Sequence, residues 1–126
     1  MIYLDTHVVV WLYSGDLSLF PGVACQRLEE HELVISPMVL LELQYLYEIG
    51  KIVVEPLIIF DSLAESIGLW KCRASFGRVI AESMRITWTR DPCDRIITAT
   101  ALLHDTILIT KDEAIRSHCD LALWEE

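Results

Sequence analysis

The stretch Ile-Tyr-Leu-Asp-Thr at residues 2–6 decides the fold class of this chain. Its three apolar residues run without a break into an aspartate, which is typical of a short strand that is buried on both faces and ends at Asp5. We expect Thr6 to cap a helix that continues to about Tyr13, where Ser14-Gly15-Asp16 ends it. A buried strand that leads straight into a helix predicts a parallel sheet.

Further strands and helices alternate along the rest of the sequence in the same way. Strands are expected at residues 33–35, 69–72, 106–110 and 121–124, whereas the β-branched segment 52–54 is ambiguous. Helices are expected at residues 21–30, 36–49, 57–67, 75–84 and 91–103, followed by a short helix that ends near residue 117. Continuously apolar strands separated by helices predict an α/β fold whose parallel sheet is covered on both faces.

Length and composition fit a single domain over residues 1–126, with 53% apolar residues to build a core. No apolar run reaches the ~18 residues that span a bilayer, so no membrane association is expected. The first residues lack the basic region of a signal peptide. The four cysteines are widely spaced, with no Cys-x-x-Cys pair, which argues against a zinc site: Cys25, Cys72, Cys93 and Cys119. Nothing points to an oxidising compartment, so we expect a cytoplasmic protein.

The net charge of −9 at first argues against a nucleic-acid partner. The segment from Lys71 to Arg90, however, carries five basic residues against one acid, Glu82. We expect Arg73, Arg85 and Arg90 within this segment to be candidate contacts for an RNA backbone. The alternative interpretation is a solvated helix face on which Arg78 and Glu82 form an i, i+4 pair.

Isolated acidic residues fall near the carboxyl ends of the predicted strands, where open parallel sheets bind ligands. Asp5 ends the first strand, and Thr110 and Asp112 follow the strand 106–110. Asp94 lies in the first turn of the helix that leads to that strand, and Glu42 lies among apolar residues on the helix after the second strand. We therefore expect these four acids to meet at one edge of the sheet.

Each acid also has a structural explanation. Glu42 can be satisfied by an arginine or a helix cap, and Asp5, Asp94 and Asp112 each stand where helix-starting aspartates are favoured. For Asp91, which precedes Pro92, we prefer the capping interpretation and assign a supporting role. Four separate caps would have no reason to converge, and this favours a catalytic role for the other acids.

Convergence of carboxylates implies a cation. Two carboxylates about 4 Å apart repel each other by on the order of 4 kcal/mol at an effective dielectric constant of 20. Oxygen ligands select hard ions, so Mg²⁺ or Mn²⁺ is expected at Asp5, Glu42, Asp94 and Asp112. Such an ion activates a water and offsets charge on a phosphodiester, while the hydroxyls of Thr6 and Thr110 can hold water or phosphate.

Several motifs in order resemble those of one family. They are Tyr-Leu-Asp-Thr-His at 3–7, Trp-Leu at 11–12, Ser-Pro-Met-Val-Leu-Leu-Glu-Leu at 36–43, Arg-Asp-Pro-Cys-Asp-Arg-Ile-Ile-Thr-Ala-Thr-Ala at 90–101, Leu-Ile-Thr-Lys-Asp-Glu at 108–113 and Leu-Trp at 123–124. Together they resemble a PIN-domain protein, specifically a VapC-type toxin of a toxin–antitoxin pair. The resemblance covers essentially the whole chain, although we match no motif within 50–75.

The resemblance implies a PIN-like three-layer α/β/α sandwich around a parallel sheet of about four to five strands. It implies Mg²⁺-dependent cleavage of RNA by a quartet at Asp5, Glu42, Asp94 and Asp112, with Thr110 as a hydroxyl companion. It also implies a homodimer and inhibition by a cognate antitoxin. The one departure is Cys93, where such proteins commonly have phenylalanine.

Aromatic residues near the predicted site are consistent with a peptide partner. Not all of Trp11, Tyr13, Tyr45 and Tyr47 can be buried in so small a domain, and exposed aromatics near a site often mark an interface. Alternatively, they pack in the core or in a homodimer contact.

Two other functional classes stay open at this stage. One is a catalytically silent binding module that keeps the fold. The other is a phosphoacceptor receiver domain, which needs paired acids after the first strand and a lone aspartate after the third. Here Thr6 and His7 follow Asp5, and Lys111 is the only feature that the receiver hypothesis explains.

Overall fold

Five strands, separated by one or two α-helices each and by seven α-helices in all, lie along residues 1–125, which are the residues that this computed structural model describes. In chain order the elements are β1 (Ile2–Leu4), α1 (Thr6–Ser14), the 3₁₀ helix η1 (Leu17–Leu19), α2 (Gly22–Glu30), β2 (Leu33–Ile35), α3 (Met38–Glu48), α4 (Pro56–Ile67), β3 (Trp70–Lys71), α5 (Phe76–Ser83), α6 (Pro92–Leu103), β4 (Leu108–Ile109), α7 (Glu113–His118) and β5 (Ala122–Leu123).

The strands form one parallel sheet in the order β3-β2-β1-β4-β5. The central strand β1 pairs with β2 on one side, where Tyr3 lies opposite Val34, and with β4 on the other, where Tyr3 lies opposite Leu108. The chain therefore first builds the sheet outward from β1 in one direction and then crosses to the other side. This places a topological switch point between β1 and β4, where open α/β sheets bind ligands.

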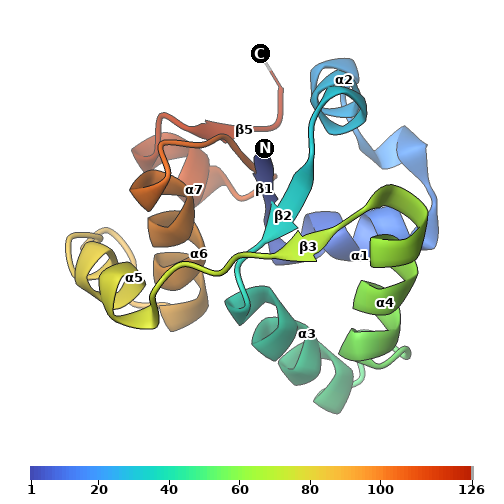
Figure 1. Ribbon diagram of the computed structural model, residues 1–126, viewed down its shortest axis with the longest axis horizontal. Helices are drawn as coiled ribbons and strands as arrows, with labels where there is room; N and C mark the ends of the chain where they lie inside the picture. The colour runs from blue at the N-terminus through green and yellow to red at the C-terminus, as the bar shows by residue number, and fades with distance from the viewer. Residues whose placement is uncertain (126) are drawn as a thin grey trace.

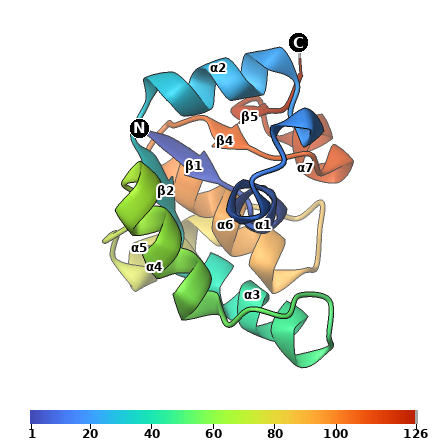
Figure 2. The same ribbon diagram turned by 90° about the vertical axis from the view of Figure 1, so that its right-hand side faces the viewer.

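Helices cover both faces of the sheet, as the predicted three-layer α/β/α sandwich requires. Figures 1 and 2 show α1, α2 and α4 on one side of the strands and α5, α6 and α7 on the other. The residues of β1, β2 and β4 are almost fully buried between these layers, which explains their uninterrupted apolar sequences. A smaller apolar cluster of Val79, Ile86 and Ala99 joins α5 to α6. Among the described residues, none of the helices is long and apolar enough to span a membrane.

The predicted elements are confirmed, with corrections at several boundaries. Thr6 is not the cap of the first helix, because it is already helical and the Asp5 side chain accepts the hydrogen bond of its backbone N–H. The strand predicted at 106–110 extends only over Leu108–Ile109. The 3₁₀ helix η1 was not predicted. The segment 52–54 forms neither strand nor helix.

The predicted pairing of Arg78 with Glu82 is wrong. Glu82 instead lies 3.7 Å from Arg85, measured between carboxylate and guanidinium, and the Arg85 side chain is 81% exposed. The chain turns after α5, where the backbone N–H of Arg85 donates to the carbonyl of Glu82, and this turn brings the two side chains together. An exposed pair of this kind contributes little stability.

Candidate active site

Five carboxylates line one cleft of about 480 Å³ at the carboxyl edge of the sheet, which we call the acidic cleft. They come from the ends of β1 and β4, from α3, and from the start of α6. The residues that line the acidic cleft are Asp5, His7, Trp11, Glu42, Asp91, Asp94, Lys111 and Asp112. The four predicted acids and Asp91 are therefore brought together, although they are spread over more than one hundred positions of the sequence.

Asp5 is held in place by hydrogen bonds on both carboxylate oxygens. Oδ1 accepts from the backbone N–H of Thr6 at 2.8 Å, and Oδ2 accepts from the hydroxyl of Thr110 at 2.6 Å. The side chain lies at the switch point between β1 and β4, and the residue is 7% exposed. Burial raises the pKa of Asp5, and repulsion from Asp112 adds to this, whereas both hydrogen bonds and His7 favour the charged form.

Thr110 connects Asp5 to Asp112. Its oxygen donates to Asp5 and accepts from the backbone N–H of Asp112 at 3.0 Å. Asp112 in turn caps α7, because its Oδ1 accepts from the backbone N–H of Ile115 at 2.9 Å. The capping interpretation of Asp112 is thus correct structurally, yet the residue also lines the acidic cleft.

The start of α6 brings Asp91 and Asp94 into the acidic cleft. Asp91 caps the helix as predicted, since its Oδ1 accepts from the backbone N–H groups of Cys93 at 2.8 Å and Asp94 at 3.2 Å. Partial burial, followed by repulsion from Asp91, Asp5, Asp112 and Glu42, raises the pKa of Asp94 to about 7. The surroundings of Asp94 therefore disfavour its charged form.

Glu42 reaches the acidic cleft from the middle of α3, where it is half-buried. Burial raises its pKa and repulsion from Asp5 and Asp91 raises it further, whereas Thr6 and His7 favour the charged form. The Thr6 hydroxyl is fully buried and makes no hydrogen bond of regular geometry. Among the described residues, ion pairs form only at Arg85–Glu82 and Arg116–Glu125, so no arginine satisfies Glu42.

The ligand types in the acidic cleft match a hard cation, but the side chains are not preorganised around one position. Carboxylate oxygens are ligands that Mg²⁺ and Mn²⁺ prefer, and five carboxylates line the acidic cleft. Within residues 1–125, no three His, Cys, Asp or Glu side chains are already arranged to hold one ion. A cation would have to draw the carboxylates of the cleft closer together.

The predicted arginines lie away from the acidic cleft, and two other basic residues line it instead. Arg73, Arg85 and Arg90 are exposed and none of them lines the cleft. Lys111 and His7 do, and the Lys111 ammonium lies 5.7 Å from the centre of the Trp11 ring. Sequence reasoning missed both as site residues, although each lies within two positions of a predicted catalytic acid.

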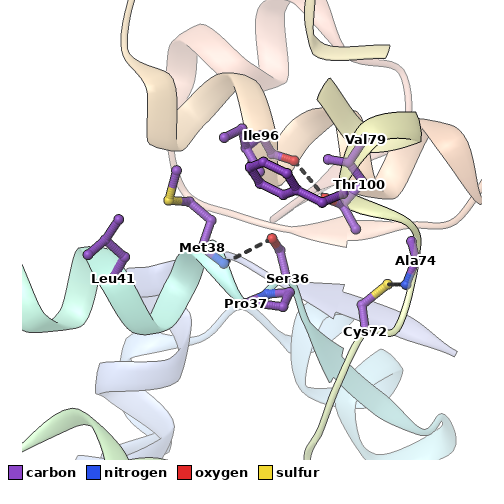
Figure 3. A pocket seen from close by; sticks show the side chains of 10 residues that line it. Ser36, Pro37, Met38, Leu41, Cys72, Ala74, Val79, Ile96 and Thr100 are labelled. Atoms are coloured by element: carbon purple, nitrogen blue, oxygen red, sulfur yellow. Dashed lines mark hydrogen bonds between the residues drawn. The ribbon is translucent and has the colours of Figure 1, made fainter. Parts of the chain in front are cut away.

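A second, apolar pocket of about 350 Å³ opens between α3, α5 and α6 (Figure 3). No carboxylate of the described residues lines it. The Ser36 hydroxyl accepts from the backbone N–H of Met38, and the Thr100 hydroxyl donates to the carbonyl of Ile96. Its lining residues are Ser36, Pro37, Met38, Leu41, Cys72, Ala74, Phe76, Val79, Ile96 and Thr100. This apolar pocket therefore lacks the carboxylates that distinguish the acidic cleft.

Known proteins resemble this chain over almost its whole length. The PIN domain family model matches residues 2–121. Ribonuclease VapC22 of Mycobacterium tuberculosis (strain ATCC 25618 / H37Rv) is 32% identical over 120 residues, which are 93% of this chain and 91% of that protein.

Solved structures resemble the fold at lower identity. A toxin–antitoxin complex from Klebsiella pneumoniae has a TM-score of 0.67 at 21% identity, covering 98% of this chain and 96% of that chain. VapBC-1 from nontypeable Haemophilus influenzae has a TM-score of 0.65 at 17% identity, covering 100% and 98%. VapBC2 from Rickettsia felis, bound to a promoter DNA fragment, has a TM-score of 0.61 at 22% identity, covering 99% and 100%. With the family model and the 32% identical relative, this places the chain in the PIN-domain family, among proteins of the VapC type.

Proposed function

We propose that this protein is a metal-dependent endoribonuclease and the toxin of a toxin–antitoxin pair. The observation that carries the proposal is the convergence of five carboxylates on one cleft, none of which forms an ion pair within the described residues. Such a cluster is costly unless a cation binds or protons are retained, and the raised pKa of Asp94 reflects that cost. The likeness to Ribonuclease VapC22 supports RNA as the substrate.

In this proposal, Asp5, Glu42, Asp94 and Asp112 would hold Mg²⁺ or Mn²⁺, and the bound ion would lower the pKa of a water and offset charge on the phosphodiester. Thr110 keeps Asp5 and Asp112 oriented through its two hydrogen bonds. The buried Thr6 hydroxyl acts through Glu42, whose charged form it favours. Lys111 at the rim attracts the RNA phosphate that the carboxylates alone would repel.

RNA cleavage with and without divalent cations tests this proposal. The purified chain should cleave RNA in Mg²⁺ or Mn²⁺ and lose that activity in excess chelator. Glu42→Gln should also abolish cleavage while keeping the fold, because it retains the shape but removes a charged ligand. Asp61→Asn, an exposed acid on α4 outside the cleft, is the matched control and should cleave like the parent. Full cleavage in chelator contradicts the metal mechanism, and no cleavage under any condition favours a silent binding module.

We also propose that a cognate antitoxin covers the acidic cleft. The similar structures from Klebsiella pneumoniae, Haemophilus influenzae and Rickettsia felis are toxin–antitoxin or VapBC complexes, which supports this assignment. The partner should present a lysine or arginine to Asp5 and Asp94, because a cation there replaces the charge of the metal. Co-expression with the small protein encoded beside this chain should give a complex without nuclease activity. A neighbour that neither binds nor inhibits contradicts the toxin assignment but not the nuclease.

The homodimer implied by the resemblance and the cytoplasmic location expected from the sequence belong to the same proposal. Sedimentation of the purified chain checks the oligomeric state, and a monomer at micromolar concentration contradicts the dimer.

A further inference from the structure

A second groove of about 490 Å³ continues from the acidic cleft along α3, and we call it the side groove. Glu42 and Asp91 line both hollows, so the two form one continuous depression. Beyond these shared acids, the side groove is lined by Leu41, Gln44, Tyr45 and Glu48 of α3 and by Cys93 at the start of α6. A polymer whose phosphate lies in the acidic cleft would therefore place a neighbouring unit in the side groove.

The wall of the side groove is one face of α3. Leu41, Tyr45 and Glu48 are separated by four and three positions, so they stand one above the other on the helix. Leu41 is 61% exposed and Tyr45 is 60% exposed, so most of the surface of each residue is accessible to solvent. An exposed aromatic ring beside a candidate nuclease site offers a flat surface on which an unpaired base can stack.

Hydrogen-bonding groups stand next to this aromatic ring. The Gln44 side-chain amide donates to Oε2 of Glu48 at 2.8 Å, which fixes the Glu48 carboxylate one turn along the helix from Tyr45. A carboxylate has about four acceptor positions, so this bond leaves most of them free. Among the described residues no lysine or arginine pairs with Glu48. The side groove thus combines a stacking surface with an oriented group that only accepts hydrogen bonds.

We propose that the side groove is a base-specificity pocket in which Tyr45 stacks on a base of the RNA and Glu48 selects guanine. The pocket would take the nucleotide next to the phosphate held in the acidic cleft, so the inference rests on the proposed ribonuclease function. Guanine is the base whose Watson–Crick edge offers two adjacent donors, N1–H and the N2 amino group, and a carboxylate accepts both. Adenine turns the lone pair of N1 toward the same carboxylate, which is repulsive.

Cleavage of a random RNA pool, followed by sequencing of the new ends, measures the base preference at each position around the cut. The parent should favour guanine at one fixed position next to the cut. Glu48→Gln places an amide donor against the donors of guanine, so that preference should fall about tenfold or more. Tyr45→Ala should slow cleavage of all sequences, because stacking is lost whichever base is present, whereas Tyr45→Phe, which keeps the ring, should restore it.

Two exposed residues outside both hollows serve as matched controls. Phe76→Ala removes a more exposed aromatic ring on α5, and Glu65→Gln neutralises an exposed acid on α4. Both variants should keep the preference and rate of the parent. A parent without guanine preference next to the cut, or a Glu48→Gln variant that keeps it, overturns the inference while leaving the ribonuclease function intact.

Binding separates the inference from the nuclease proposal. Fluorescence anisotropy of the full-length Asp5→Asn chain compares two uracil hexamers that differ by one central guanine or adenine. Tighter binding of the guanine hexamer, lost on adding Glu48→Gln, supports the pocket even if the parent cleaves no RNA. Equal binding of both hexamers overturns the inference. Substitutions of Tyr45 and Glu48 that weaken only the antitoxin complex also overturn it and assign the side groove to the antitoxin.

Discussion

At the level of a single residue, the raised pKa of Asp94 shows the electrostatic repulsion within the acidic cleft. Its carboxyl is half-buried and stands among Asp91, Asp5, Asp112 and Glu42, and these surroundings raise its pKa from 3.8 to about 7. The helix cap alone predicts the opposite direction, because the positive end of the α6 dipole favours a charged carboxylate. Burial and the neighbouring acids outweigh the dipole, which is the pattern expected of a functional site.

The raised pKa gives a pH-dependent prediction for the metal-free protein. Between pH 4 and about 7 the folded state holds a proton on Asp94 that the unfolded chain releases, so the contribution of this group to stability falls as pH rises. Asp94→Asn cannot ionise and should gain melting temperature relative to the parent between pH 5 and pH 8. Calorimetric melting in chelator checks this, with Asp61→Asn as the control whose difference stays flat. If the melting temperatures of Asp94→Asn and the parent differ by the same amount at pH 5 and pH 8, the pKa of Asp94 is not raised.

At the level of elements, the junction between β1, β4 and α7 depends on Thr110. This one hydroxyl donates to Asp5 at the end of β1 and accepts from Asp112 at the start of α7. Thr110 is fully buried and Asp5 is 7% exposed, so water does not readily replace the hydrogen bond between these two side chains. The strand ends are held in register by a hydrogen bond between side chains as well as by the sheet.

Thr110→Val removes both hydrogen bonds at nearly constant volume. The free energy of unfolding should fall by roughly 1–3 kcal/mol, because polar groups are left without partners in a buried place. RNA cleavage should fall as well, since Asp5 loses its orientation. Urea denaturation and cleavage assays measure the two effects. Thr110→Ser keeps the hydroxyl and should recover most of the activity, and Thr87→Val, at an exposed position, should change neither. Parent-like stability of Thr110→Val contradicts the role of the bridge.

The elements themselves were largely predictable, and their boundaries show where sequence reasoning stops. The uninterrupted apolar runs at Ile2–Leu4 and Leu33–Ile35 identify strands because only a strand buried on both faces reads this way. The start of α6 follows from Asp91 and Pro92. β4 is shorter than predicted because its pairing to β1 and β5 decides its extent, and no local pattern records that pairing.

At the level of the whole molecule, the candidate site depends on long-range arrangement more than on any motif. Asp5, Glu42, Asp94 and Asp112 were predictable because parallel strands end at one edge of the sheet. The entry of Lys111 and His7 into the acidic cleft was not, because side-chain direction in a loop or first helical turn depends on tertiary packing. For the same reason, the sequence did not reveal that Arg73, Arg85 and Arg90 lie outside the cleft.

The uneven charge of the molecule gives a prediction for RNA binding. The chain has a net charge of −9, yet the segment from Lys71 to Arg90 is strongly basic. If the exposed side chains of Arg73 and Arg85 contact the RNA backbone, the double variant to glutamine should bind RNA more weakly and with a salt slope smaller by about 1–2, since fewer counterions are released. Anisotropy at several salt concentrations measures the slope. An unchanged slope assigns these arginines to a solvated surface.

Calorimetric titration of the metal-free protein with Mn²⁺ or Mg²⁺ tests the proposed role of the acidic cleft most directly. Removing one negative charge by Asp5→Asn or Asp94→Asn keeps the side-chain volume, so any loss of affinity reports on the cation alone. The parent should bind the divalent cation, and both variants should bind it at least tenfold more weakly, because a charged ligand is worth more than 1.4 kcal/mol. If both variants bind the cation like the parent, or if the parent binds none, the acidic cleft is not a metal site.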